Sequence, residues 1–147
     1  MSEKIILLVE DNPSDEALTL RALKKNNIGS GVVVVRDGAE ALDYLLDRCS
    51  DAADLRAMPQ LILLDLNLPK IDGLEVLRRI RADQRTRLLP VVILTSSGEE
   101  RDIVQGYGLG ANSFVRKPVD FVQFTEAVRQ LGLYWLIINE PPPVSWH

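Results

Sequence analysis

Five short apolar runs alternate along the chain with segments that carry apolar residues at helical spacing. The runs are apolar and rich in β-branched residues, and the fifth is the weakest. Such runs are typical of strands that are buried on both faces, as in a parallel sheet covered by helices. The predicted strands are 5–9, 32–35, 61–64, 91–94 and 113–115, and the predicted helices are 15–25, 39–49, the segment with Leu74, Leu77 and Ile80, 99–107 and 122–138.

The alternation of strands and helices predicts an α/β fold. Five βα units indicate a flavodoxin-like doubly wound five-stranded parallel sheet, (βα)5. We expect one domain over residues 1–147, with a core from about residue 4 to 139 and a Pro-rich tail at 140–147. The tail is predicted to be extended, and a docking element is the alternative. The polar segment 50–59 is predicted to be a loop within the domain, and no output module is expected.

The first helix has clear start signals and an amphipathic pattern. Asn12, Pro13 and Ser14 precede it, in the order that favours a capped helix start. Ala17, Leu20 and Leu23 follow at helical spacing, and we expect them on its buried face.

Composition and charge exclude several functional classes. The hydrophobic fraction of 46% is enough for a full core, and the formal net charge of −4 comes without the basic patch that a nucleic-acid binder needs. No apolar stretch reaches the 18 residues of a membrane span, and the N-terminus does not resemble a signal peptide. The single cysteine fits a reducing compartment, so we expect a cytoplasmic protein.

Polar and charged residues stand at the ends of the first, third, fourth and fifth predicted strands. Glu10-Asp11 follows the first, Asp65-Leu66-Asn67 the third, Thr95 the fourth, and Lys117 comes shortly after the fifth. Because the carboxyl ends of parallel strands share one edge of the sheet, we expect these side chains to lie close together. The alternative for each acid alone is a strand-end carboxylate that faces water.

A cluster of carboxylates requires a compensating charge. Two like charges at ~4 Å repel each other by about 4 kcal/mol at an effective dielectric constant near 20. A bound divalent cation removes this cost, and a site made of oxygen ligands beside a phosphate favours magnesium. The sequence therefore predicts a Mg²⁺ site at this edge.

The set Glu10-Asp11, Asp65, Thr95 and Lys117-Pro118 resembles the receiver domains of two-component response regulators. The resemblance covers about residues 4–139, in order and with matching strand placement. It implies a signalling switch that assists its own phosphorylation and dephosphorylation and has no external substrate. A sensor histidine kinase is the implied phosphoryl donor.

The resemblance also implies a role for each carboxylate. Asp65 would be the phosphoacceptor, a nucleophile that forms an aspartyl phosphate. Asp11 and Asp65 would bind Mg²⁺ directly, and Glu10 would act largely through water. The backbone carbonyl of Asn67 would complete the protein ligands.

The remaining implied roles concern the response to the phosphoryl group. Lys117 would pair with a phosphoryl oxygen, and Thr95 would donate its hydroxyl to the same group. Phe114 falls at the aromatic switch position, although a plain core aromatic remains the alternative. A receiver that has lost phosphorylation and acts as a constitutive interaction module is a second functional class, against which Asp11, Asp65, Thr95 and Lys117 argue. An enzyme with an external substrate is a distant third.

The last predicted helix carries more apolar residues than one buried face needs. Its expected core stripe consists of Phe121, Phe124, Val128, Leu131, Trp135 and Ile138. Four further apolar residues lie outside this stripe: Leu133, Tyr134, Leu136 and Ile137. A helix that is apolar all round should be covered. One possibility is burial under the tail or a neighbouring helix, and the other is a homodimer formed by the fourth helix, fifth strand and fifth helix.

Three features narrow the resemblance further. The loop at 50–59, the segment 65–70 and the Tyr134-Trp135 helix with its Pro-rich tail are similar to the small response regulators paired with bacterial phytochromes. This similarity implies a phytochrome-type kinase as donor, although other stand-alone receivers could share these features.

Overall fold

The computed structural model describes residues 5–25, 31–47, 58–95, 100–117 and 121–140. Its elements follow the predicted order, and the strands agree with the prediction to within one residue at each end. The strands are β1 (Ile6–Val9), β2 (Val32–Val35), β3 (Leu61–Leu64), β4 (Val91–Thr95) and β5 (Ser113–Arg116). The helices are α1 (Pro13–Lys25), α2 (Gly38–Leu42), α3 (Gly73–Ala82), α4 (Glu100–Gly108) and α5 (Phe121–Gly132), with the π-helical turns η2 (Asp43–Asp47) and η5 (Leu133–Ile138) after α2 and α5.

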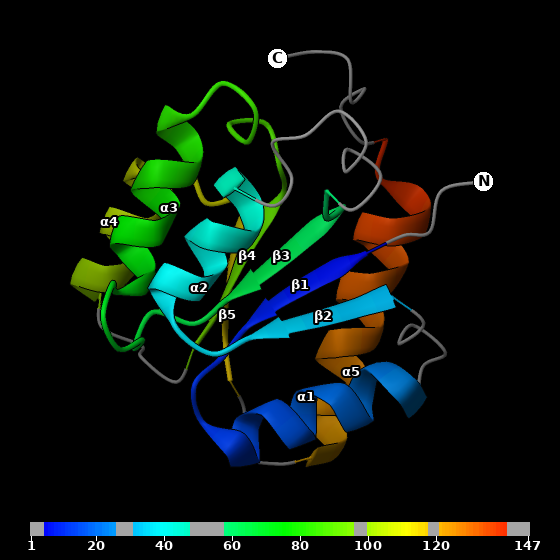
Figure 1. Cartoon of the computed structure of the whole chain (residues 1–147). Helices are drawn as coiled ribbons and strands as arrows, with labels where there is room; N and C mark the ends of the chain where they lie inside the picture. Colours follow the sequence, from blue (N-terminus) through cyan, green and yellow to red (C-terminus); the bar gives the residue numbers. More distant parts are fainter. Residues whose placement is uncertain (1–4, 26–30, 48–57, 96–99, 118–120, 141–147) are drawn as a thin grey trace.

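The strands form one parallel sheet in the order β2-β1-β3-β4-β5 (Figure 1). Chain order reverses at β1, where the sequence moves from β2 on one side to β3 on the other. This topology confirms the predicted flavodoxin-like fold. A functional site is therefore expected beyond the carboxyl ends of β1 and β3.

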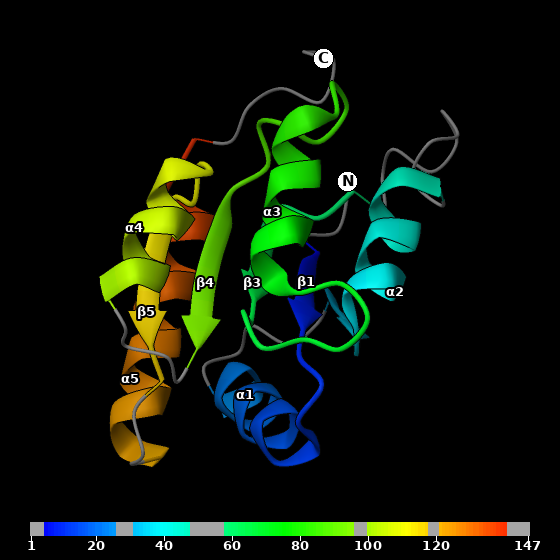
Figure 2. The ribbon, with the colours of Figure 1, turned by 90° about the vertical axis from the view of Figure 1, so that its left-hand side faces the viewer.

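Helices cover both faces of the sheet (Figures 1 and 2). Leu7 and Val9 of β1 belong to the core with residues of α2 and α3, whereas Ile6 and Leu8 belong to the core with residues of α1 and α5. Adjacent residues of a strand point to opposite faces, so an uninterrupted apolar run supplies both cores. This explains why the strands lack polar alternation.

Helix α1 has the expected start signals, but it begins at Pro13, two residues before the predicted start, and it buries a different face. The Asn12 side chain accepts hydrogen bonds from the N–H groups of Ser14 and Asp15, at 2.9 and 3.1 Å, and so caps the helix. The buried residues are Thr19, Ala22 and Leu23, while Ala17 is exposed. The prediction for Ala17 was wrong because Thr19 takes part in the core: its hydroxyl donates to the Asp15 carbonyl, at 2.8 Å, and so has a partner inside.

The end of the fifth helix also differs from the prediction. Phe124 and Val128 are buried as expected, but Ile138 is exposed. The reason is η5, because a π-helical turn bonds residues five apart and shifts the helical phase away from the predicted stripe. Trp135 still packs, half-buried, against the core between the sheet, α1 and α5.

Several predicted features lie outside the described residues. These are the end of the second helix at 48–49, most of the 50–59 loop, Glu99, the Lys117–Pro118 peptide bond and the tail from 141 onward. Within the ranges that are described, no helix has the length and hydropathy of a bilayer crossing.

Gly73, the first residue of α3, lies against the backbone that carries Asp65. Its N–H donates to the Leu66 carbonyl at 3.0 Å. A Cβ atom at this position would lie 2.2 Å from the Asp65 carbonyl oxygen and 2.6 Å from the Leu66 Cα. Both contacts are with backbone atoms, which cannot rotate away, so the close approach requires glycine.

We therefore expect Gly73→Ala to lower the free energy of unfolding by about 1–3 kcal/mol, the usual cost of overpacking. Gly108→Ala is the matched control, because a Cβ at residue 108 meets no atom within 4 Å. Urea unfolding followed by circular dichroism measures both. Equal stability of the two variants would contradict this account of Gly73.

Candidate functional site

The strand ends that carry the predicted site are fixed by the sheet itself. The backbone N–H of Glu10 donates to the Val35 carbonyl at 3.0 Å, and that of Asp65 donates to the Val9 carbonyl at 3.1 Å. On the other side, the Lys117 N–H donates to the Thr95 carbonyl at 2.7 Å. These bonds continue the ladder past the strands, so the site residues sit on a rigid edge.

Asp65 is buried and accepts hydrogen bonds on both carboxylate oxygens. Oδ1 accepts from the Thr95 hydroxyl at 3.0 Å and from the Asn67 N–H at 3.1 Å. Oδ2 accepts from the Lys117 ammonium at 3.1 Å. The structure thus brings together Asp65, Thr95 and Lys117, as the sequence predicted.

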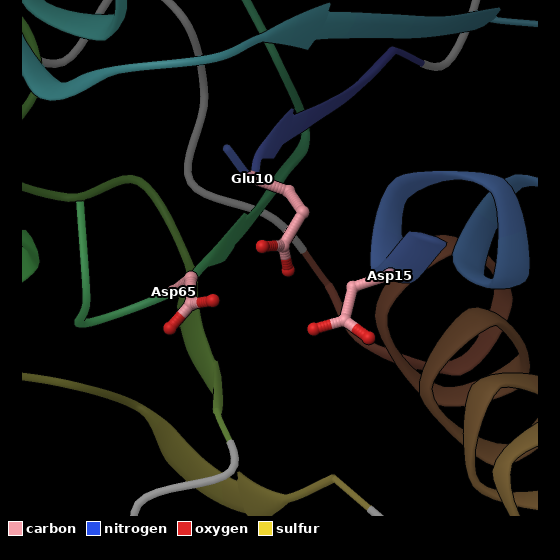
Figure 3. Close-up of side chains that lie close together, drawn as sticks. All are labelled: Glu10, Asp15 and Asp65. Atoms are coloured by element: carbon pink, nitrogen blue, oxygen red, sulfur yellow. The ribbon is translucent and has the colours of Figure 1, made fainter. Parts of the chain in front are cut away.

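The Lys117 ammonium lies among three carboxylates. It donates to Glu10, to Asp65 and, at 3.0 Å, to Asp15, so each of its three N–H donors has a charged acceptor. Figure 3 shows the three carboxylates turned toward a common space, from β1, β3 and the start of α1. The Lys117 side chain is only 8% exposed, so these charges interact with little screening by water.

Asp15 is the site residue that sequence reasoning missed. It lies in the first turn of α1, and its carboxylate contributes to a group in which oxygens of Glu10, Asp15 and Asp65 all lie within 4.8 Å of one another. The available signal was its spacing: Asp15 stands four residues before Thr19 and seven before Ala22, on the buried stripe of α1. An acid at such a position points toward the sheet.

The other two predicted metal ligands have a different environment. Asp11 is exposed and does not belong to this group of three. Asn67 contributes its N–H to Asp65, and its side chain is exposed. The roles of the Asp11 carboxylate and the Asn67 carbonyl in binding a metal stay predictions.

The pKa values of two site residues, Glu10 and Lys117, are both raised. Burial raises the pKa of Glu10 to about 7, against the lowering effect of the Lys117 hydrogen bond, and the nearby Asp65 adds to the rise. Burial disfavours the charge on Lys117, but the hydrogen bond to Glu10 and the charges of Asp65 and Glu10 outweigh it and raise the pKa of Lys117. Lys117 is therefore a permanent cation at neutral pH.

The donor set fits a hard divalent cation. When Glu10, Asp15 and Asp65 are all ionised, three negative charges and the one positive charge of Lys117 leave a net charge of −2. The ligand atoms are all carboxylate oxygens, which suit Mg²⁺ or Mn²⁺ better than softer metals. One divalent cation would neutralise the cluster.

The response regulator receiver domain model matches residues 6–129, which includes the whole sheet and every site residue above. The chain belongs to the response regulator receiver family. Receivers act in phosphorylation-dependent signalling, their partners are sensor histidine kinases, and they bind a divalent metal at an acidic pocket. This receiver is accordingly a signalling protein and not an enzyme of the ordinary kind.

Similar proteins include regulators from Methanothrix harundinacea and from Synechocystis sp.. The probable methanogenesis regulatory protein FilR2 of Methanothrix harundinacea is 41% identical over 138 residues, which cover 94% of this receiver and 87% of FilR2. Response regulator Rcp1 of Synechocystis sp. is 38% identical over 133 residues, with 90% of this receiver and 89% of Rcp1 covered.

Solved structures agree over nearly the whole receiver. The phosphorylated cyanobacterial phytochrome response regulator RcpA has a TM-score of 0.85 at 40% identity and covers 96% of this chain and 99% of its own. The Mn²⁺-bound form of Rcp1 has a TM-score of 0.83 at 35% identity, with 96% and 100% covered. The predicted family and fold are thus confirmed.

The raised pKa of Glu10 predicts a pH dependence of stability in the metal-free receiver. The unfolded carboxyl ionises near 4.5 while the folded one keeps its proton to about 7, so folding stability falls as pH rises through this window. The Glu10→Gln variant lacks this loss. In EDTA, the free energy of unfolding of Glu10→Gln relative to that of wild type should increase by on the order of 3 kcal/mol between pH 4.5 and 7.5.

Urea unfolding at a series of pH values measures this difference. Saturating Mg²⁺ should abolish most of it, because a bound cation takes the place of the proton on Glu10. A stability difference between wild type and Glu10→Gln that does not change with pH would contradict the assignment.

Proposed function

We propose that this receiver is a switch in which Asp65 accepts a phosphoryl group from a sensor histidine kinase, with a divalent cation bound beside it. One observation carries the proposal: both oxygens of buried Asp65 already accept from Thr95 and Lys117, at 3.0 and 3.1 Å. A hydroxyl and an ammonium are the donors that a transferred phosphoryl group needs.

The chemistry follows from these contacts. An Asp65 carboxylate oxygen attacks phosphorus, the bond between phosphorus and the kinase histidine nitrogen breaks, and that nitrogen keeps the electron pair. Asp65, Glu10, Asp11 and the Asn67 carbonyl would hold the Mg²⁺, which neutralises charge on the transferring group. Lys117 would stabilise the same charge as a fixed cation beside Asp65.

The switch begins with Thr95. Once Asp65 is phosphorylated, the Thr95 hydroxyl has a better acceptor in the phosphoryl oxygens, and we propose that it turns to them. Thr95 is fully buried, so its movement changes the packing at the end of β4. The gain of charge-assisted bonds then shifts the population between two packings of this region.

Phe114 is placed to respond to that change. Its half-buried ring lies beside Gly106 of α4: a Cβ at Gly106 would be 3.5 Å from the ring and 2.8 Å from Ile93 Cδ1. We propose that Phe114 is the aromatic switch. A Cβ at residue 106 would clash with Ile93 but only touch the ring, so the glycine lets α4 pack closely beside it. The half-buried position of the ring, at the border of the core, supports a movable ring over a plain core aromatic.

The surface around the edge strand β5 supports a homodimer. β5 ends the sheet, with α4 on one side and α5 on the other (Figure 2). We define the β5-edge surface by the exposed apolar side chains of α4, α5 and η5, namely Val104, Tyr107, Val122, Leu133, Tyr134 and Ile138. Contiguous exposed apolar patches mark interaction sites, and we propose that these side chains form one. We propose that a second copy of the receiver covers them.

The kinase that donates the phosphoryl group is proposed to be of the phytochrome type. Support comes from RcpA, a phytochrome response regulator that matches 96% of this receiver. The Mn²⁺-bound form of Rcp1 supports a divalent cation, and Mg²⁺ is the ion we propose for this site. A cytoplasmic location is supported by the single cysteine, which allows no internal disulfide.

Phosphorylation tests the central proposal. With acetyl phosphate and Mg²⁺, wild type should gain one acid-labile, hydroxylamine-sensitive phosphoryl group, and Asp65→Ala should gain none, because the nucleophile is missing. Asp83→Asn is the matched control, since Asp83 pairs with Arg85 at the far end of α3. Intact-mass measurement counts the groups.

Two outcomes would refute parts of this scheme. Equal labelling of wild type and Asp65→Ala would refute the assignment of Asp65. Transfer from an unrelated histidine kinase as fast as from a phytochrome-type kinase would refute the proposed donor class while leaving Asp65 untouched.

Size-exclusion chromatography with light scattering tests the dimer. Wild type should elute as a dimer at tens of micromolar, and Tyr134→Asp should be a monomer because it places a charge within the covered surface. Leu88→Asp changes an exposed apolar residue outside the β5-edge surface and should stay dimeric. A clean monomer of wild type, with and without a phosphoryl mimic, would refute the proposal.

A further inference from the structure

We propose that Asp15 is a positioning residue that keeps Lys117 directed into the site when a divalent cation occupies it. The inference rests on the proposed function and deepens it, because it assigns a task to the one site carboxylate that neither the strand ends nor the sequence motif supply. Asp15 does not touch the phosphoryl group in this scheme. It acts through the Lys117 ammonium, which lies 3.0 Å from its Oδ2.

The need for such a residue follows from the charges. Lys117 shares Glu10 and Asp65 with the proposed cation site, and both are buried, with side chains 2% and 9% exposed. A cation bound by these two carboxylates competes with Lys117 for their oxygens and repels its ammonium. Of its three carboxylate partners, Lys117 then keeps Asp15, which does not stand at a strand end.

Asp15 is held so that it can serve this purpose. Its N–H is bound by the capping Asn12 side chain at 3.1 Å, and its carbonyl accepts from the buried Thr19 hydroxyl at 2.8 Å. It lies in the first turn of α1. Its side chain is 36% exposed, so it lies at the mouth of the site and not on its floor.

Lys117 can contact Asp15 and a phosphoryl group at the same time. Its ammonium has three N–H donors, and at present each goes to a different carboxylate. With one donor retained by Asp15, the other two can turn from Glu10 and Asp65 to an arriving phosphoryl oxygen. Without Asp15, the ammonium beside a bound cation would turn outward to water, and the transfer would lose its second positive charge.

The competing role for Asp15 is that of a metal ligand, since its carboxylate belongs to the same oxygen group. The two roles differ in what they change. A ligand sets how much Mg²⁺ is needed, whereas a positioning residue sets the rate when Mg²⁺ is saturating.

The experiment measures phosphorylation by radiolabelled acetyl phosphate over a range of Mg²⁺ concentrations. Asp15→Asn should lower the maximal rate about tenfold, the equivalent of one charge-assisted hydrogen bond, and should change the half-saturating Mg²⁺ concentration less than about threefold. Asp15→Glu should recover the rate to within about threefold of wild type. Glu16→Gln is the matched control, because this neighbour on α1 pairs with Arg36 and not with Lys117.

A double-mutant cycle assigns the effect to Lys117. In a Lys117→Met background, Asp15→Asn should cause no further loss, because the group it positions is gone. Lys117→Gln replaces this background if Lys117→Met does not fold, as judged by thermal unfolding in Mg²⁺.

Two results would overturn the inference. An unchanged maximal rate with a raised Mg²⁺ requirement would make Asp15 a metal ligand, and a tenfold loss that persists in the Lys117→Met background would mean that Asp15 does not act through Lys117. Either result leaves Asp65 as the phosphoacceptor. By contrast, failure of the proposed function itself would appear as labelling of wild type that does not depend on Asp65.

Discussion

The ion pairing of Lys117 is the interaction on which the site depends. A lysine whose side chain is only 8% exposed keeps its charge only when carboxylates replace the water it has lost, and here Glu10, Asp15 and Asp65 do so. The reverse also holds, because the three carboxylates would repel one another without a cation among them. Since Lys117 follows β5 while its partners come from β1, α1 and β3, this one side chain joins segments that are far apart in the sequence.

The site residues meet at one edge of the sheet because both faces of the sheet are buried. Strands whose neighbouring residues enter opposite cores have no side chain left for polar contacts along their length. The polar residues must therefore stand where the strands end, and parallel strands end at one edge. The switch in strand order opens that edge between β1 and β3, so Glu10 and Asp65 face each other there.

Sequence reasoning predicted the parts that follow from periodicity. The five apolar runs gave the strands, and their ends gave Asp65, Thr95 and Lys117. It missed Asp15 because the buried face of α1 was assigned from its apolar residues alone, which placed Ala17 inside, whereas the true stripe contains Thr19. Ile138 was misplaced for another reason: its exposure depends on the π-helical phase of η5, which residue types do not reveal.

The same backbone bonds that fix the site also connect it to the surface. The Lys117 N–H binds the Thr95 carbonyl, and the β4–β5 register pairs Ile93 with Phe114, two residues before Thr95. In the proposed switch, a shift of Thr95 toward a phosphoryl group would therefore act on β4, with which Phe114 is in register. The ring in turn lies against Gly106 of α4, at the border of the β5-edge surface. In the proposed switch, a phosphoryl group on Asp65 would thus act on the surface through Thr95, the paired strands β4 and β5, and the contact of Phe114 with α4.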